Sequence, residues 1–121
     1  MQVESMQFES KQAQSRLLGC KILLEELTTA MVRCQLWSEQ SPSSVAMAST
    51  APFACDTMAF EQWLQFIFIP KIHLLIEQQQ PLPMKIAILP MAEEVYKAAK
   101  GRQAVLTALA RIDRLLGEPL A

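Results

Sequence analysis

Few side chains in this sequence of 121 residues are of the types that bind metals or act as nucleophiles. There are three cysteines and one histidine. Cys20 and Cys34 fall on one face of a predicted helix but lie roughly 21 Å apart along its axis, too far to share a metal ion or a disulfide bond. Zinc needs about four ligands around one point. We therefore expect no metal, no cofactor and no disulfide, and we expect both cysteines in the core.

Cys55 and His73 could each have either a structural or a functional role. Cys55 stands beside Asp56 near the expected start of a helix, where other proteins keep reactive thiols, so plain packing and a reactive role are both retained. A catalytic pair of Cys55 and His73 is not expected, because about 25 Å of helix would separate them. His73 follows Pro70 by three residues and could donate to a carbonyl that the proline frees, with a binding role as the alternative.

Two polar residues in the middle of the chain are expected to hold the backbone. Asp56 is a good N-cap residue and predicts the start of a helix, with contact to a charged ligand as the alternative. Gln65 is the one polar residue between Trp63 and Ile69. A buried amide without partners costs on the order of 1–3 kcal/mol. We therefore expect Gln65 to bind the backbone of a loop, near residues 50–53.

The elements that must position these residues are helices. Apolar residues recur at spacings of three and four from Leu17 to Cys34, which predicts a long helix over residues 12–37. A second helix is expected from Asp56 or Thr57 to about residues 78–80. It is apolar nearly all round at its centre, with a kink or short break at Pro70.

Two shorter helices follow in the second half of the chain. One is expected over residues 90–100, with Pro90 in its first turn, and one from near Val105 to Gly117. The conformation of residues 84–89 stays open. Residues 1–10 are predicted to be a mobile arm, and residues 11–121 a single helical domain. The predicted fold is all-α, an up-and-down four-helix bundle with a long loop, residues 38–54, between its first two helices.

Composition narrows the classes of function. Lys and Arg number 11 against 12 Asp and Glu, which gives a net charge of −1. Proteins that bind nucleic acids usually carry a basic excess, so bulk charge argues against such a partner. The longest apolar run, residues 63–69, is far shorter than the ~20 residues that cross a bilayer. No signal peptide is visible and the cysteine count is odd, so we expect a cytoplasmic protein with no membrane contact.

The stretch from Ser49 to Pro83 resembles the YqcC-like family of small bacterial proteins. The resemblance rests on Ser49, Thr50, Pro52, Phe53, Asp56, Thr57 and Met58, then on Trp63, Leu64, Gln65, Ile69, Pro70, His73, Gln80, Pro81, Leu82 and Pro83, with Trp37 fitting too. It implies a helical bundle and no established activity. Members are often encoded beside a tRNA pseudouridine synthase, which implies an accessory role in tRNA modification. This chain departs from the family in its N-terminal arm and its longer Ser-rich loop.

A helix that is apolar on all sides needs cover on all sides, and an exposed remnant would be a partner surface. We expect the Pro70 kink, the loop of residues 49–56 and the corner of residues 81–83 to frame an apolar groove. Its candidate residues are Phe53, Asp56, Trp63, Gln65, Pro70, His73 and Leu82. The expected function is that of a non-enzymatic interaction or accessory protein with a protein partner. The alternatives are a helper of tRNA pseudouridylation, which binds the synthase or tRNA, and a small-ligand binder.

Overall fold

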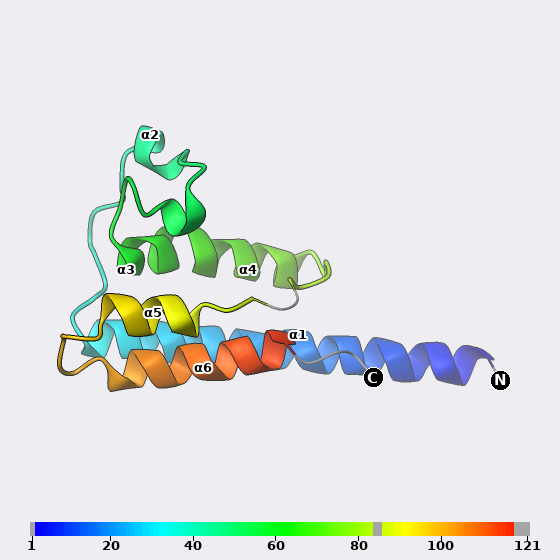
Figure 1. Ribbon diagram of the computed structural model, residues 1–121. Coiled ribbons are helices and arrows are strands. Elements are labelled where there is room, and N and C mark those ends of the chain that lie inside the picture. The colour runs from blue at the N-terminus through cyan, green and yellow to red at the C-terminus, as the bar shows by residue number, and fades with distance from the viewer. Residues whose placement is uncertain (1, 84–85, 118–121) are drawn as a thin grey trace.

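The computed structural model describes residues 2–83 and 86–117, and the regular elements among them are helices, with no strand (Figure 1). The all-α class is therefore confirmed. α1 and α6 lie side by side, and α5 and the helix made of α3 and α4 lie over this pair. No helix in the described part of the chain is long and apolar enough to cross a membrane.

α1 spans Gln2–Arg33, 32 residues and about 48 Å, so the predicted start at residue 12 was wrong. The first 18 residues contain no glycine or proline and are rich in Gln, Glu and Met, which favour helix without an apolar stripe. The N-terminal half of α1 extends past the end of α6 in Figure 1. Mobility of residues 1–10 stays a prediction.

The end of α1 also differs from the prediction. Gln35 takes a left-handed conformation, with φ 60°, and the Leu36 N–H donates to the Met31 carbonyl over 2.8 Å. These are the marks of a Schellman cap, which ends the helix before Trp37. The sequence signal for this cap is usually glycine, and glutamine at the same position hides it.

α6 spans Gln103–Gly117 and runs antiparallel to α1. Arg16 of α1 donates to the Leu116 carbonyl at the C-terminal end of α6 over 2.9 Å, and Arg102 donates to the Cys34 carbonyl at the end of α1 over 3.2 Å. Each guanidinium thus meets the negative end of a helix dipole. The core between and above the two helices includes the fully buried Leu24, Leu27, Met31, Val105, Leu109, Ile112 and Leu116.

The second long helix consists of α3 (Phe60–Trp63), a π-helical stretch η2 (Leu64–Phe68) and α4 (Ile69–Glu77). The predicted break at Pro70 takes the form of this π-helix, directly before the proline. Proline has no N–H and its ring crowds the carbonyl four residues earlier, and a wider turn relieves both problems without ending the helix. The helix therefore passes through Pro70.

The predicted start of this helix at Asp56 was wrong. The N-cap is Ala59, whose N–H donates to the Gln62 side chain over 3.0 Å. Asp56 instead accepts a 2.5 Å hydrogen bond from the Ser49 hydroxyl, inside the loop. That loop also contains α2 (Ser44–Met47) and the short 3-10 helix η1 (Pro52–Ala54).

α5 spans Leu89–Val95, with Pro90 in its first turn as predicted, but ends at Tyr96 rather than at residue 100. Its N-terminus is capped from another helix. Asp113 of α6 accepts hydrogen bonds from the N–H groups of Ile88 (3.0 Å) and Leu89 (2.7 Å). Of the stretch that the sequence left open, residues 84–85 lie outside the described residues and residues 86–88 are not helical.

Gln65 is buried, with 7% of its surface exposed, and binds a loop backbone as predicted. Its carbonyl oxygen accepts from the Ser38 N–H, and its amide donates to the Ser38 carbonyl, both over 2.8 Å. The expected partner near residues 50–53 was wrong. These two hydrogen bonds tie the second long helix to the chain just after α1, and they satisfy both polar ends of the buried Gln65 amide.

The substitution Gln65→Leu should lower the free energy of unfolding by about 2–3 kcal/mol, because it leaves both backbone groups of Ser38 without their partner. Urea unfolding followed by circular dichroism measures the change. Gln14→Leu, on an exposed position of α1, is the matched control and should change stability by less than about 0.5 kcal/mol. Equal effects of the two substitutions would contradict the role given to Gln65.

Asp113→Ala should cost about 1–2 kcal/mol, because it removes the cap of α5. Asp113→Asn should cost less, since its amide oxygen can still accept one of the two hydrogen bonds. Asp56→Ala, an exposed aspartate that caps no helix, serves as the control. Thermal unfolding of the three variants would rank them, and a loss for Asp56→Ala as large as for Asp113→Ala would reject the assignment.

Candidate functional site

Five aromatic side chains form an aromatic cluster at the start of the second long helix. Phe53 from η1 meets Trp63 edge to face, with ring centroids 4.8 Å apart, and Phe60 at 6.0 Å. Trp63 also stacks on Phe68 at 5.5 Å, and Phe60 meets Tyr96 of the α5 end at 5.9 Å. Contacts of this kind add roughly 0.5–1.5 kcal/mol each beyond the area buried. The cluster fastens the loop to the helices.

The backbone that carries Phe53 into this cluster is strained. Phe53 and Ala54 both have positive φ, 57° and 48°. A left-handed conformation costs a residue with a side chain roughly 1–2 kcal/mol. The ring contacts of Phe53 offset this cost, so the loop conformation depends on the aromatic cluster.

A groove of about 290 Å³ opens beside the cluster, between η1, the start of α3 and α5. We call it the η1–α5 groove. Val95 at its edge is 43% exposed and Cys55 is exposed. Its walls are mostly apolar and include two methionines, which adapt easily to different partners. It is lined by Phe53, Cys55, Met58, Ala59, Phe60, Glu61, Met91 and Val95.

The structure brings together only part of the predicted site. Phe53 lines the η1–α5 groove, and Trp63 touches Phe53 from behind it. Both rings are half-buried, so neither is an exposed aromatic anchor. Asp56 is exposed and bound to Ser49, and Gln65 is occupied by Ser38.

The other three predicted residues lie outside this groove. Pro70 is exposed, and His73 and Leu82 are half-buried. His73 has no hydrogen bond among the described residues, so it does not make the bond to a freed carbonyl that the sequence allowed. The π-helical stretch accommodates the proline without help from the His73 side chain.

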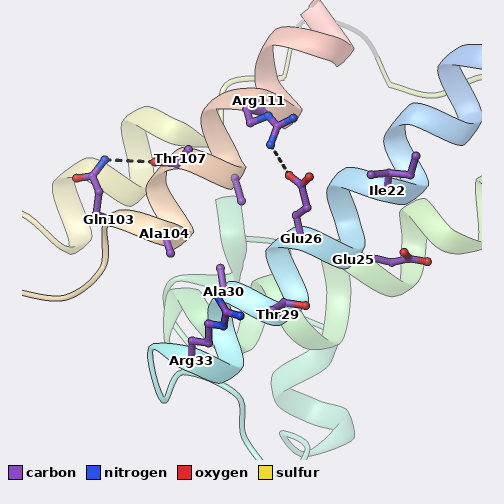
Figure 2. Close-up of a pocket in the computed structure, with 11 residues that line it drawn as sticks. Ile22, Glu25, Glu26, Thr29, Ala30, Arg33, Gln103, Ala104, Thr107 and Arg111 are labelled. Atoms are coloured by element: carbon purple, nitrogen blue, oxygen red, sulfur yellow. Dashed lines mark hydrogen bonds and ion pairs between the residues drawn. The ribbon is translucent and has the colours of Figure 1, made fainter.

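A larger groove, of about 510 Å³, runs between α1 and α6, and we call it the α1–α6 groove (Figure 2). Its floor contains the small buried residues Ala30 and Ala108, which leave space between the helices, and the exposed Ala104 also lines it. One ion pair bridges it, from Arg111 to Glu26 over 2.6 Å. The lining also includes Ile22, Glu25, Thr29, Arg33, Gln103 and Thr107.

Sequence reasoning missed the α1–α6 groove, because its two walls are far apart in the chain. The apolar period of each helix shows which face is buried, but it does not show that α1 pairs with α6. The available signal was the pair of small residues Ala104 and Ala108, one turn apart on α6. An exposed ion pair such as Glu26–Arg111 contributes little, about 0–1 kcal/mol, so the groove is not closed by it.

The basic corner of residues 97–102 has structural uses. Lys97 pairs with Glu94 over 2.7 Å. The Arg102 guanidinium lies 5.9 Å from the centre of the Tyr96 ring and also donates to the end of α1. Arg102 is therefore held at the end of α1, whereas Lys97 forms an exposed ion pair that contributes little to stability.

Two groups next to these elements have shifted pKa values. Burial raises the pKa of Tyr96 well above 10.0. The Glu61 carboxylate raises it further, because it accepts a 2.9 Å hydrogen bond from the Tyr96 hydroxyl and is negatively charged. Burial raises the pKa of the Cys20 thiol from 9.0 to about 11, against the opposing effect of Arg16. Cys20 is therefore a protonated core residue, as predicted.

This chain is similar to known bacterial proteins over most of its length. A family model described as tRNA pseudouridine synthase C matches residues 19–115. An uncharacterized protein of Haemophilus influenzae is 41% identical over 92 residues, covering 76% of this chain and 87% of that protein. The uncharacterized protein YqcC of Escherichia coli is 31% identical over 99 residues, which cover 81% of this chain and 91% of that protein. The chain belongs to the YqcC-like family.

Two further similarities extend this YqcC-like assignment. The solution NMR structure of E. coli YqcC aligns with a TM-score of 0.74 and 30% identity, over 88% of this chain and 89% of that one. A tRNA pseudouridine synthase C of Pectobacterium carotovorum subsp. carotovorum is 37% identical over 60 residues, half of this chain but only 16% of that protein. The expected family resemblance is thereby confirmed.

Tyr96 is the only tyrosine of the chain, so the ultraviolet absorbance of tyrosinate reports on it alone. In the folded protein it should titrate well above 10.0, and in denaturant near 10.0. Above that pH the unfolded state loses this proton first, so the free energy of unfolding should fall as pH rises. Tyr96→Phe should reduce the fall. A folded-state midpoint near 10.0 would contradict the burial of Tyr96 and its contact with Glu61.

Proposed function

We propose that this YqcC-like protein is a non-enzymatic accessory protein that binds tRNA pseudouridine synthase C in the cytoplasm. One observation supports the proposal most directly. Sequence related to this chain makes up nearly the whole of the two uncharacterized relatives. It also makes up 16% of a tRNA pseudouridine synthase C. Because half of this chain has a counterpart within the larger enzyme, the chain is a natural candidate for a partner of that enzyme.

The η1–α5 groove is the surface that we assign to the synthase. It combines an apolar wall with the exposed Val95, and the Phe53 ring that lines it is held by the aromatic cluster. A preorganised apolar patch limits the entropy lost on binding. In this proposal the helices form the predicted up-and-down four-helix bundle, a rigid support for the groove.

Direct tRNA binding is the weaker alternative. The net charge is −1, and Lys97 and Arg102 are engaged within the protein. Small-ligand binding called for a cavity lined by Gln65 or His73, and neither residue lines the η1–α5 or the α1–α6 groove. The proposal therefore gives the protein partner precedence.

Binding of the purified protein to tRNA pseudouridine synthase C from the same organism, measured by calorimetry, tests the proposal. Val95→Glu should weaken the complex at least about tenfold, because it places a charge on the apolar rim. Val45→Glu is the matched control, since Val45 is 82% exposed on α2, and it should bind like the wild type. Both variants replace exposed side chains, so folding should be retained.

Two outcomes would count against the proposal. A wild-type protein that does not bind the synthase would reject it. Binding to tRNA alone, with an affinity that falls steeply with salt, would favour the nucleic-acid alternative.

A further inference from the structure

The side of α1 that faces away from the core carries an unusual set of exposed side chains. Three large aliphatic residues are exposed there and on its flank, Leu18 (60%), Ile22 (49%) and Val32 (54%). Single exposed aliphatic residues are ordinary on protein surfaces. Here Leu18 and Ile22 are one helical turn apart, and Ile22 lines the α1–α6 groove, whose floor includes the buried Ala30 and Ala108. Small residues at a groove floor allow the backbone of another helix to approach closely.

The charges on this side have a two-fold pattern. Thr29 lies at its centre, with Glu25 four residues before it and Arg33 four residues after it. All three line the α1–α6 groove, and Figure 2 shows them along α1. Neither Glu25 nor Arg33 has an ion-pair partner among the described residues. If a second copy of this surface is rotated by 180° about an axis beside Thr29, its Arg33 lies opposite Glu25 and its Glu25 lies opposite Arg33.

We propose that two copies of this chain associate through α1, antiparallel, about a two-fold axis that passes beside Thr29. Glu25 of each copy then faces Arg33 of the other, so the same ion pair forms twice. Val32 of each copy is covered by the other copy's helix, opposite position 26, and Ile22 lies against the cap that follows the other copy's α1, opposite Leu36. The Glu26–Arg111 pair within each copy is kept.

A second copy fits this surface because its charges are already the required ones. Any other helix would need a base and an acid with the same spacing, whereas the second copy provides them by symmetry. The contact involves one helix pair and the groove beside it, which is small for a permanent dimer. We therefore expect association in the micromolar range. The surface is separate from the η1–α5 groove, so the inference does not depend on the proposed function.

Sedimentation of the full chain from micromolar to millimolar concentration tests this arrangement. The wild type should shift from a mass of 13.6 kDa toward twice that value as concentration rises. Glu25→Arg alone and Arg33→Glu alone should each weaken self-association at least about tenfold, because each creates two like-charge contacts. Glu93→Arg, an exposed charge reversal on α5, should behave like the wild type.

The decisive measurement mixes the two single variants. Positions 25 and 33 are then both basic in the first variant and both acidic in the second, so each base of one chain faces an acid of the other. A mixed dimer should form where neither variant associates alone, and this recovery also shows that both variants are folded. A wild type that stays monomeric at millimolar concentration, or a mixture that stays monomeric, would overturn the proposal. So would dimerisation of either single variant with wild-type strength.

Discussion

The antiparallel packing of α1 on α6 is the contact on which the other elements depend. It buries aliphatic side chains from both helices completely, Leu24 and Leu27 against the layer that contains Leu109 and Ile112. Hydrophobic burial is non-directional, so it brings the helices together without fixing how they end. Two arginines fix the ends, since each donates to the last carbonyls of the opposite helix. α5 and the second long helix then have a surface on which to pack.

Two buried or half-buried polar side chains set the position of those later elements. A helix as apolar as the one at the centre of this chain could rotate against its neighbours at little cost in buried area. The Gln65 amide removes that freedom, because both of its polar ends are matched only at Ser38. Asp113 does the same for α5, which has no capping side chain of its own. Specific polar contacts thus select one arrangement among many that bury similar apolar area.

The sequence predicted the helices well where an apolar period or a proline marked them, and poorly where the signal was unconventional. The disturbance before Pro70 was foreseen, because proline has a fixed chemical effect on a helix. The ends of α1 were not, since polar residues extend it at one end and a left-handed glutamine stops it at the other. Of the candidate site, the nearness of Phe53 to Trp63 follows a local loop, whereas the α1–α6 groove joins distant segments that no periodicity connects.

The π-helical stretch η2 (Leu64–Phe68) has a consequence for how this chain tolerates changes in length. A π-turn holds about one residue more than an α-turn over the same rise, so η2 acts as an inserted residue absorbed inside a helix. A homologue that lacks one residue between Trp63 and Pro70, and that has no proline at position 70, could form an uninterrupted α-helix there and keep both flanking apolar faces in phase. A single-residue gap in this stretch would then mark a change of helix type and leave the surrounding core intact.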